Sequence, residues 1–240
     1  MPTRLSVGGE TRENGGVKAI IVLFDGVQRD EFDAFASVLS LVRTLEVVTV
    51  AAKPGRTHGP GGGIHADTAF DEIDAADIVV VPGGLGCERA AQDRALLSFL
   101  DRVGRPARYV AASSTGTVIL AAAGLLHGET AATHWLAGGL LQRFGSIADA
   151  RRLVDAGGVI TCSGMLSAVD AALALAERVE GSHSIERIKA ELLAAGAAHL
   201  QPDPWWRPLA WLLRVRRDSD ATSESRQQVE GGVTPLSVMI

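Results

Sequence analysis

We predict the fold outward from the stretch RYVAASSTGTVILAAAG, Arg108 to Gly124. It has the pattern of a short apolar strand that turns sharply, at its serine pair, into an alanine- and leucine-rich helix. Such a corner exposes its middle side chain at the carboxyl edge of a sheet, beside the unpaired N–H groups of the helix's first turn. Ser114 stands at the apex, and Gly116 removes a side chain that would crowd the turn. The stretch therefore predicts a nucleophile elbow at Ser114.

The same serines have a simpler interpretation. Serine and threonine are common helix N-caps, so Ser113 or Ser114 would serve only to hold the first turn of the helix. The stretch taken alone favours neither interpretation over the other.

The segments before the elbow alternate between strand and helix patterns. Lys18 to Phe24 and Ala76 to Gly84 are continuous apolar runs of the kind found in buried parallel strands, and a third begins at Glu46. Between the run that ends at Phe24 and the run that begins at Glu46, apolar residues recur at helical spacing: Phe32, Phe35, Ala36, Leu39 and Val42. We expect the Pro-Gly-Gly ending of the run at Ala76 to leave backbone N–H groups free at the strand's carboxyl edge.

A glycine-rich stretch, KPGRTHGPGGGIHADTAF, follows the second strand and resembles a phosphate loop only superficially. It lacks the Lys-Ser/Thr ending of such a loop, and no helix follows its glycines. We therefore predict a loop and hairpin there.

The segments after the elbow continue the alternation. Ala131 to Trp135 is a short extended piece that we expect to return His134 to the same sheet edge. A hairpin turned at Asp155 to Gly158 follows, and then a long helix that ends at Gly181 and a last helix from Ile185 to Gly196. The whole pattern predicts a doubly wound, mainly parallel α/β sheet with helices on both faces, which binds ligands at the carboxyl ends of its strands.

Composition narrows the class of protein. The chain has 240 residues, 47% hydrophobic and 21% charged, with a net charge of −5. Such a balance fits a soluble globular protein with a small-molecule ligand and argues against nucleic acid, which requires a clustered basic surface. Cys87 and Cys162 have no metal-ligand spacing, so we expect neither a disulfide nor a metal, and no cofactor. No secretory leader or membrane span is evident, which favours the cytoplasm.

Four segments organise the chain. We expect residues 1–17 and 218–240 to be disordered and 18–200 to form the α/β domain. Residues 201–217 contain Trp205, Trp206 and Trp211 beside a basic cluster, and we interpret them as an amphipathic helix that covers a groove of its own domain or of a second subunit. A membrane-surface anchor is the alternative, which the arginines of the cluster would favour.

Four ordered motifs carry a resemblance to a known family. They are FDGVQRDEFDAF, VVVPGGLG, SSTGTVILAAAGLLHG and ATHW. Together they resemble the ThiJ/PfpI superfamily of flavodoxin-like, class I glutamine-amidotransferase-like proteins. The isonitrile hydratase branch is the nearest, and the sensor domain of certain AraC-type transcription regulators is also similar. The resemblance implies an α/β domain from Lys18 to about Gly196, and dimerisation, common in that family, implies a homodimer.

The resemblance also implies a site at the elbow. Family members carry an elbow cysteine, an acid from the first loop and an anion pocket of backbone amides. Carried over, the elbow position is Ser114 and the acid is Glu31. The binding residues are Gly83, Gly84 and Thr115, and the histidine that follows is His134. Apart from the resemblance, the position of Cys87 just after the Pro-Gly-Gly turn makes it a weaker candidate for the same pocket, as a displaced thiol; the competing interpretation is a small residue at a helix start. Because a serine hydroxyl stays protonated where a thiol can ionise, isonitrile hydration through a thiolate does not carry over with the motifs.

Three functions fit such a site. In the first, Ser114 is a nucleophile with His134 or Glu31 as its base, although the order of these residues differs from that of common hydrolases. In the second, Glu31 is a general acid and base without a covalent step, as in a hydratase, lyase, isomerase or cyclase. In the third, the pocket only binds a ligand, as a sensor domain does. We favour the second, because a carboxyl group buried beside the elbow would be a proton donor. The competing interpretation of Glu31 is an exposed acid in the first turn of a helix.

Overall fold

The computed structural model describes residues 16–195. The expectations for residues 1–15 and for those after residue 195, the tryptophan-rich segment included, lie outside this range. No helix among the described residues is both long enough and apolar enough to cross a bilayer.

A seven-stranded sheet forms the centre of the fold, in the order β10-β11-β7-β6-β1-β2-β5. Neighbouring strands run parallel except for the antiparallel pair β10 and β11. The strand bounds are β1 Val17–Val22, β2 Leu45–Ala51, β5 Thr68–Ala69, β6 Ile78–Val81, β7 Tyr109–Ser113, β10 Leu153–Asp155 and β11 Val159–Cys162. The predicted doubly wound, mainly parallel sheet is confirmed. The predicted hairpin turned at Asp155 to Gly158 is also confirmed, and its strands β10 and β11 lie at one edge of the sheet.

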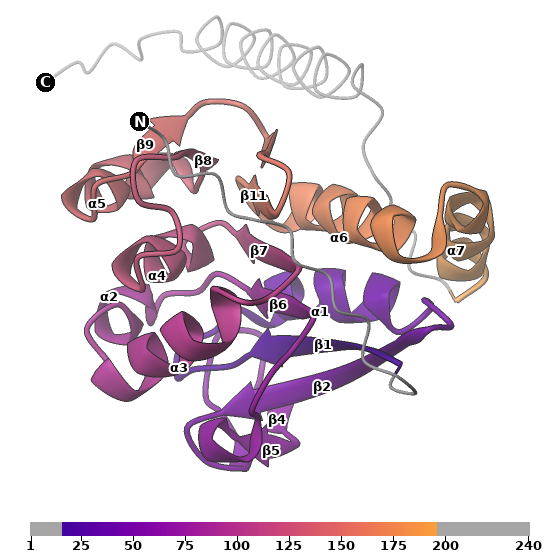
Figure 1. Ribbon diagram of the computed structural model, residues 1–240, viewed down its shortest axis with the longest axis horizontal. Coiled ribbons are helices and arrows are strands. Elements are labelled where there is room, and N and C mark those ends of the chain that lie inside the picture. The colour runs from indigo at the N-terminus through magenta and orange to yellow at the C-terminus, as the bar shows by residue number, and fades with distance from the viewer. Residues whose placement is uncertain (1–15, 196–240) are drawn as a thin grey trace, which may run out of the picture. The chain divides into compact units, whose positions relative to one another are not determined.

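Helices cover both faces of this sheet. On one face, α1 (Arg29–Leu39) packs against α6 (Met165–Glu180), and α7 (His183–Ala194) packs on both. On the other face, α3 (Arg94–Gly104) and α4 (Gly116–Ala122) contact β6 and each other. Figure 1 shows α3 and α4 on the near side of the sheet and α1 on the far side. Two short helices, α2 (Cys87–Ala90) and α5 (Gly138–Arg143), flank α4.

Smaller elements complete the fold. The glycine-rich stretch forms the antiparallel hairpin of β3 (Gly55–Arg56) and β4 (His65–Ala66), which confirms the predicted hairpin. The short helix η1 (Phe70–Glu72) follows β5. After the elbow helix, β8 (Thr130–Ala132) pairs in parallel with β9 (Ile147–Asp149) in a separate two-stranded sheet. The sequence pattern did not indicate β9, because two three-residue strands joined by helical segments leave no periodic signal.

The buried face of α1 differs from the predicted one. Its buried residues are Glu31, Ala34, Phe35, Val38 and Leu39, whereas Phe32 and Ala36 are only partly buried. The five buried residues follow the spacing i, i+3, i+4, i+7 and i+8, which places them on a single stripe along the helix. The helix also ends at Leu39 and not at Arg43. The consequence for function is that a carboxyl group occupies the first position of a buried stripe.

The topology brings two loops together above the centre of the sheet. From β1 the chain extends the sheet through β2 to β5, and then returns to the other side of β1 through β6 and β7. The reversal of direction lies between β1 and β6, where doubly wound folds bind their ligands. Here an isolated bridge joins Val27, in the loop before α1, to Gly84, in the loop after β6.

The start of α4 fits against the end of β6 only because it carries no side chain. A Cβ atom on Gly116 would lie 2.2 Å from the carbonyl oxygen of Val81 and 2.8 Å from that of Pro82. Both neighbours are backbone atoms, which cannot move aside by changing a rotamer.

We predict that Gly116→Ala lowers the free energy of unfolding by about 1–3 kcal/mol, the usual cost of forcing extra atoms into a packed interior. The matched control is Gly139→Ala, because an added Cβ there meets nothing within 4 Å. Urea unfolding followed by circular dichroism should show an unchanged or slightly raised stability for the control. Equal stability of the two variants would contradict the packing argument.

Candidate functional site

The elbow has a strained backbone at its apex. Ser114 is the one non-glycine residue among the described residues with a positive φ, 52°. This left-handed conformation costs an L-residue roughly 1–2 kcal/mol, so the surrounding structure must enforce it. The Ser114 N–H donates to the carbonyl of Cys162 at 2.7 Å, and the Ser114 carbonyl accepts from the hydroxyl of Thr133 at 2.8 Å. The predicted strand-turn-helix elbow is confirmed.

Neither serine caps the helix. The N-cap of α4 is Thr115, and its side chain makes no capping hydrogen bond. The Thr115 hydroxyl instead accepts from the N–H of Gly84 at 2.8 Å and donates to the carbonyl of Gly84 at 2.9 Å. The capping interpretation of Ser113 and Ser114 is therefore wrong, and Thr115 ties the elbow to the loop after β6.

The loop after β6 lies directly against the elbow. A Cβ atom on Gly83 would fall 2.7 Å from the Cβ of Ser114, so only glycine allows this approach. The Gly83 N–H donates to the hydroxyl of Ser113 at 3.3 Å, while Gly84 donates to Thr115. The expectation that these N–H groups are free is thus wrong, because side-chain hydroxyls of the elbow already accept from both.

Glu31 is buried beside the two serines. Only 7% of its surface is exposed, and its Oε2 atom is buried without a hydrogen-bond partner among the described residues. Desolvation raises the pKa of this carboxyl above its ordinary value, and the negative charge of Asp30 acts in the same direction. Hydrogen bonding by the hydroxyls of Ser113 and Ser114 and by the backbone of Gly83 opposes this rise in pKa without cancelling it. Glu31 is therefore inclined to keep its proton.

The neighbouring acids do not share this environment. Asp30 is exposed, and Asp33 is paired with Arg29 at 2.8 Å on the same helix. Glu31 is thus the acid of this segment that reaches the elbow, and the interpretation of Glu31 as an exposed first-turn acid is wrong. The sequence contains a signal for the burial of Glu31. Extending the helical spacing of the apolar residues back by one turn reaches Glu31 from Ala34, Phe35, Val38 and Leu39.

Both cysteines lie near the elbow as buried thiols. Cys87 begins α2, its N–H donates to the carbonyl of Gly84 at 3.2 Å, and the hydroxyl of Thr115 hydrogen-bonds to its side chain. Desolvation nevertheless raises the pKa of Cys87 above its ordinary value. Cys162 is fully buried next to Ser113 in the sheet register, and desolvation followed by the charge of Glu31 raises the pKa of its thiol strongly. Neither thiol is therefore predisposed to ionise.

His134 is placed differently from the other predicted site residues. Its Nδ1 accepts from the N–H of Leu136 at 3.3 Å and so caps the short helix η2 (Trp135–Ala137), and its ring lies against that of Trp135. Within residues 16–195, no hydrogen bond or ion pair joins His134 to Ser114 or Glu31. The structure therefore brings together Glu31, Ser114, Gly83, Gly84, Thr115 and Cys87, but engages His134 elsewhere.

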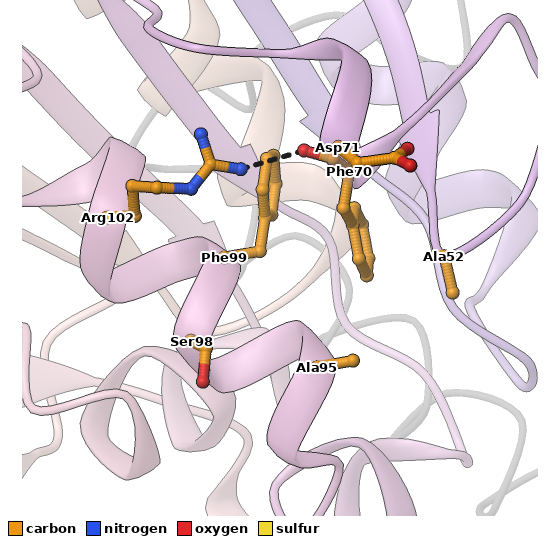
Figure 2. A pocket seen from close by; sticks show the side chains of 7 residues that line it. All are labelled: Ala52, Phe70, Asp71, Ala95, Ser98, Phe99 and Arg102. Carbon is orange, nitrogen blue, oxygen red and sulfur yellow. Dashed lines mark hydrogen bonds between the residues drawn. The ribbon is translucent and has the colours of Figure 1, made fainter.

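A separate hollow of about 410 Å³ lies between η1 and α3. Figure 2 shows Arg102 beside the rings of Phe99 and Phe70, which are stacked with centroids 4.4 Å apart. The Arg102 guanidinium donates to the backbone carbonyls of Phe70 at 2.8 Å and Ile73 at 2.7 Å. The lining contains neither Glu31 nor Ser114. Through these two hydrogen bonds Arg102 fixes η1 and the residue that follows it to α3.

The chemistry available at the elbow is proton transfer. In the part of the chain that the structure describes, no group of three or more His, Cys, Asp or Glu side chains is placed to hold a metal ion. A buried carboxyl with a raised pKa donates a proton readily, and the hydroxyls around it can orient a small polar molecule.

Comparison with known proteins extends these findings. The DJ-1/PfpI family matches residues 17–178. Isonitrile hydratase from Pseudomonas putida is 34% identical over 141 residues, which are 59% of this chain and 62% of that protein. The HTH-type transcriptional regulator GbdR from Pseudomonas aeruginosa is 39% identical over 72 residues, 30% of this chain and 19% of the regulator. A THiJ/PfpI family protein from Pseudomonas syringae shares the fold, with a TM-score of 0.72, 22% identity and coverage of 83% of this chain and 86% of that one.

The burial of Glu31 predicts a pH-dependent stability. Because its pKa is raised in the folded chain, the stability linked to this group is fully present below the unfolded pKa and is lost as the pH rises through the folded pKa. Glu31→Gln, which stays neutral, should therefore gain stability relative to the unchanged chain between pH 4 and pH 8. Urea unfolding at both pH values measures this gain. The same pH-dependent gain in the control Asp30→Asn, an exposed site, would contradict the assignment to Glu31.

The left-handed apex predicts a difference between two variants at one position. Both Ser114→Gly and Ser114→Ala remove the hydroxyl, but only glycine relieves the positive φ. We expect Ser114→Gly to be more stable than Ser114→Ala by about 1 kcal/mol. Thermal and urea unfolding of the pair measure this difference, and equal stabilities would show that the apex is not strained.

Proposed function

The chain belongs to the DJ-1/PfpI family, and we propose that its elbow site carries out non-covalent acid–base chemistry on a small molecule. The reaction is of the hydratase, lyase, isomerase or cyclase type. Glu31 is the general acid and base, and the hydroxyls of Ser113 and Ser114 position the reacting group. The observation that carries this proposal is the buried Oε2 atom of Glu31, which has no partner among the described residues.

An unpaired buried oxygen on a carboxyl group is costly unless it carries a proton or meets a ligand. The raised pKa of Glu31 favours the first condition in the free protein, and in our proposal a bound substrate meets the second. In this proposal the Glu31 carboxyl transfers its proton from the unpartnered Oε2 side, while the hydroxyls of Ser113 and Ser114 act on the same carboxyl. Proton transfer by a positioned side chain accelerates reactions by about 10²–10⁴-fold.

The similarity to isonitrile hydratase supplies a test reaction. In a non-covalent route, Glu31 would protonate the terminal carbon of an isonitrile and generate a nitrilium ion. Water would then add to that carbon and return a proton to the Glu31 carboxylate, which leaves an N-substituted formimidic acid. Transfer of the proton from its oxygen to its nitrogen gives the N-substituted formamide, so one water is consumed and the acid is regenerated. Ser114 takes no covalent part in this route, and its hydroxyl holds the carboxyl in place.

A ligand-binding role without turnover is the second candidate. The similarity to GbdR over 72 residues favours it, because that protein is a transcriptional regulator. The same buried carboxyl would then serve as a hydrogen-bond donor to a bound ligand. The two functions differ in whether a product accumulates.

We expect Glu31→Gln to lower the turnover of an alkyl isonitrile by about 10²–10⁴-fold, because the amide cannot supply a proton. Formation of the formamide, followed by nuclear magnetic resonance, measures turnover in the unchanged chain, in Glu31→Gln and in the control Asp30→Asn. The control should retain activity, since its carboxylate is exposed. Full activity in Glu31→Gln would contradict the proposed role.

A further variant separates the chemistry from the pocket. If only Ser114→Cys turns over the isonitrile, the native reaction is a different one in the same pocket. Ligand binding without product in any variant would favour the sensor role.

A further inference from the structure

We propose that a hollow beside the end of β2, apart from the elbow, binds a small carboxylate that carries an apolar body. This β2 hollow has a volume of about 300 Å³ and lies between the ends of β1 and β2, the turn into β3 and the start of α3. Its lining contains neither Glu31 nor Ser114, so the proposal adds a second site and does not rest on the function proposed above. Parallel α/β sheets bind ligands at the carboxyl ends of their strands, and the β2 hollow lies at that edge.

The floor of the β2 hollow is apolar and held in place. Leu23, Phe70 and Leu96 line it, and each of them is buried. The Leu23 N–H donates to the carbonyl of Val50 at 2.7 Å, which extends the pairing of β1 with β2 to the edge of the hollow. The Phe70 ring stacks on Phe99, as Figure 2 shows. A ligand with an apolar body would cover this surface, and its removal from water favours binding.

Two cations without partners line the same hollow. Lys53 follows the end of β2, Arg56 lies in β3, and both are exposed. Among residues 16–195, neither side chain takes part in a hydrogen bond or an ion pair. The Arg56 side chain lies across Gly63, where an added Cβ atom would fall 2.4 Å from its Nε. The glycine thus leaves the space in which the guanidinium group lies.

The two carboxylates that line the β2 hollow are already engaged. Asp93 caps α3, and its Oδ1 accepts from the N–H of Ala95 at 2.9 Å. The Oδ1 of Asp25 accepts from the backbone N–H of His58 at 3.1 Å, and the ring Nδ1 of His58 lies 3.7 Å from the same oxygen. The charge that still lacks a partner in the hollow is therefore positive. A carboxylate suits it, because a guanidinium group such as that of Arg56 can donate two parallel hydrogen bonds to a carboxylate.

Four probes test the proposal in the full chain at pH 7: cyclohexanecarboxylate, cyclohexanecarboxamide, cyclohexylammonium and acetate. The first three share an apolar ring and differ in charge, whereas the first and last share the carboxylate and differ in the apolar body. The backbone resonances of Lys53 and Gly55 report the β2 hollow, and those of Gly83 and Ser114 report the elbow. We expect cyclohexanecarboxylate to bind most tightly and to shift the resonances of the hollow. Tighter binding of the amide or the ammonium, equal binding of acetate, or no detectable binding of cyclohexanecarboxylate would overturn the proposal.

Arg56→Gln should weaken the binding of cyclohexanecarboxylate by about tenfold, the usual effect of losing a hydrogen bond to a charged group, and should weaken binding of the neutral amide less. Lys53→Gln should act in the same direction. Both variants should fold, because both side chains are exposed. Arg89→Gln is the matched control, since Arg89 is an exposed arginine on α2 outside the lining of the hollow. Unchanged carboxylate binding in Arg56→Gln and Lys53→Gln, or equal weakening in the control, would contradict the assignment.

Glu31→Gln separates this second site from the elbow. Because Glu31 does not line the β2 hollow, the variant should bind cyclohexanecarboxylate as tightly as the unchanged chain does, whether or not its turnover falls. Loss of carboxylate binding in Glu31→Gln, or shifts at Gly83 and Ser114 in place of Lys53 and Gly55, would put the carboxylate at the elbow and refute the second site. The proposed function can thus fail while the second site stands, and the second site can fail while the proposed function stands.

Discussion

The site depends on two hydrogen bonds that hold the backbone of Ser114 in the left-handed conformation. The carbonyl of Cys162 receives its N–H at 2.7 Å, and the hydroxyl of Thr133 donates to its carbonyl at 2.8 Å. The two partners come from β11 and from the segment after β8, so the strain at the apex is opposed by elements on two sides. Because this clamp fixes the turn, Ser113 and Ser114 both reach the carboxyl of Glu31 from a single corner of the sheet.

The same packing determines which groups are available for chemistry. Glycine at positions 83 and 116 lets the loop after β6, the elbow and the start of α4 approach at distances that no side chain would permit. At such distances the hydroxyls of Ser113 and Thr115 satisfy the backbone of the loop. What remains beside these hydroxyls is the buried carboxyl of Glu31, whose pKa is raised by desolvation. Close packing has thus paired the N–H groups of the loop with the elbow and left a carboxyl group beside it.

Much of this could be predicted from the sequence, because buried parallel strands leave a clear signal. The apolar runs of β1, β6 and β7, the hairpin at Asp155 and the end of the long helix at Gly181 follow from local pattern alone. The hydrogen bonds of Gly83 and Gly84 could not be predicted, since they depend on how closely two loops approach. The pairing of β8 with β9 was equally hidden, and the burial of Glu31 required the correct rotation of α1 about its axis.

The clamp on Ser114 also has a consequence for how the molecule is made. Glu31 emerges early in synthesis, the elbow emerges midway, and the carbonyl of Cys162 belongs to one of the last strands of the sheet. Until β11 has paired with β7, nothing from that side holds the apex in its costly conformation. The geometry of the elbow therefore depends on a strand that the chain supplies only after most of the sheet. The helix that follows this strand, α6, also packs against α1, which carries Glu31, so the last third of the described chain supports both sides of the site.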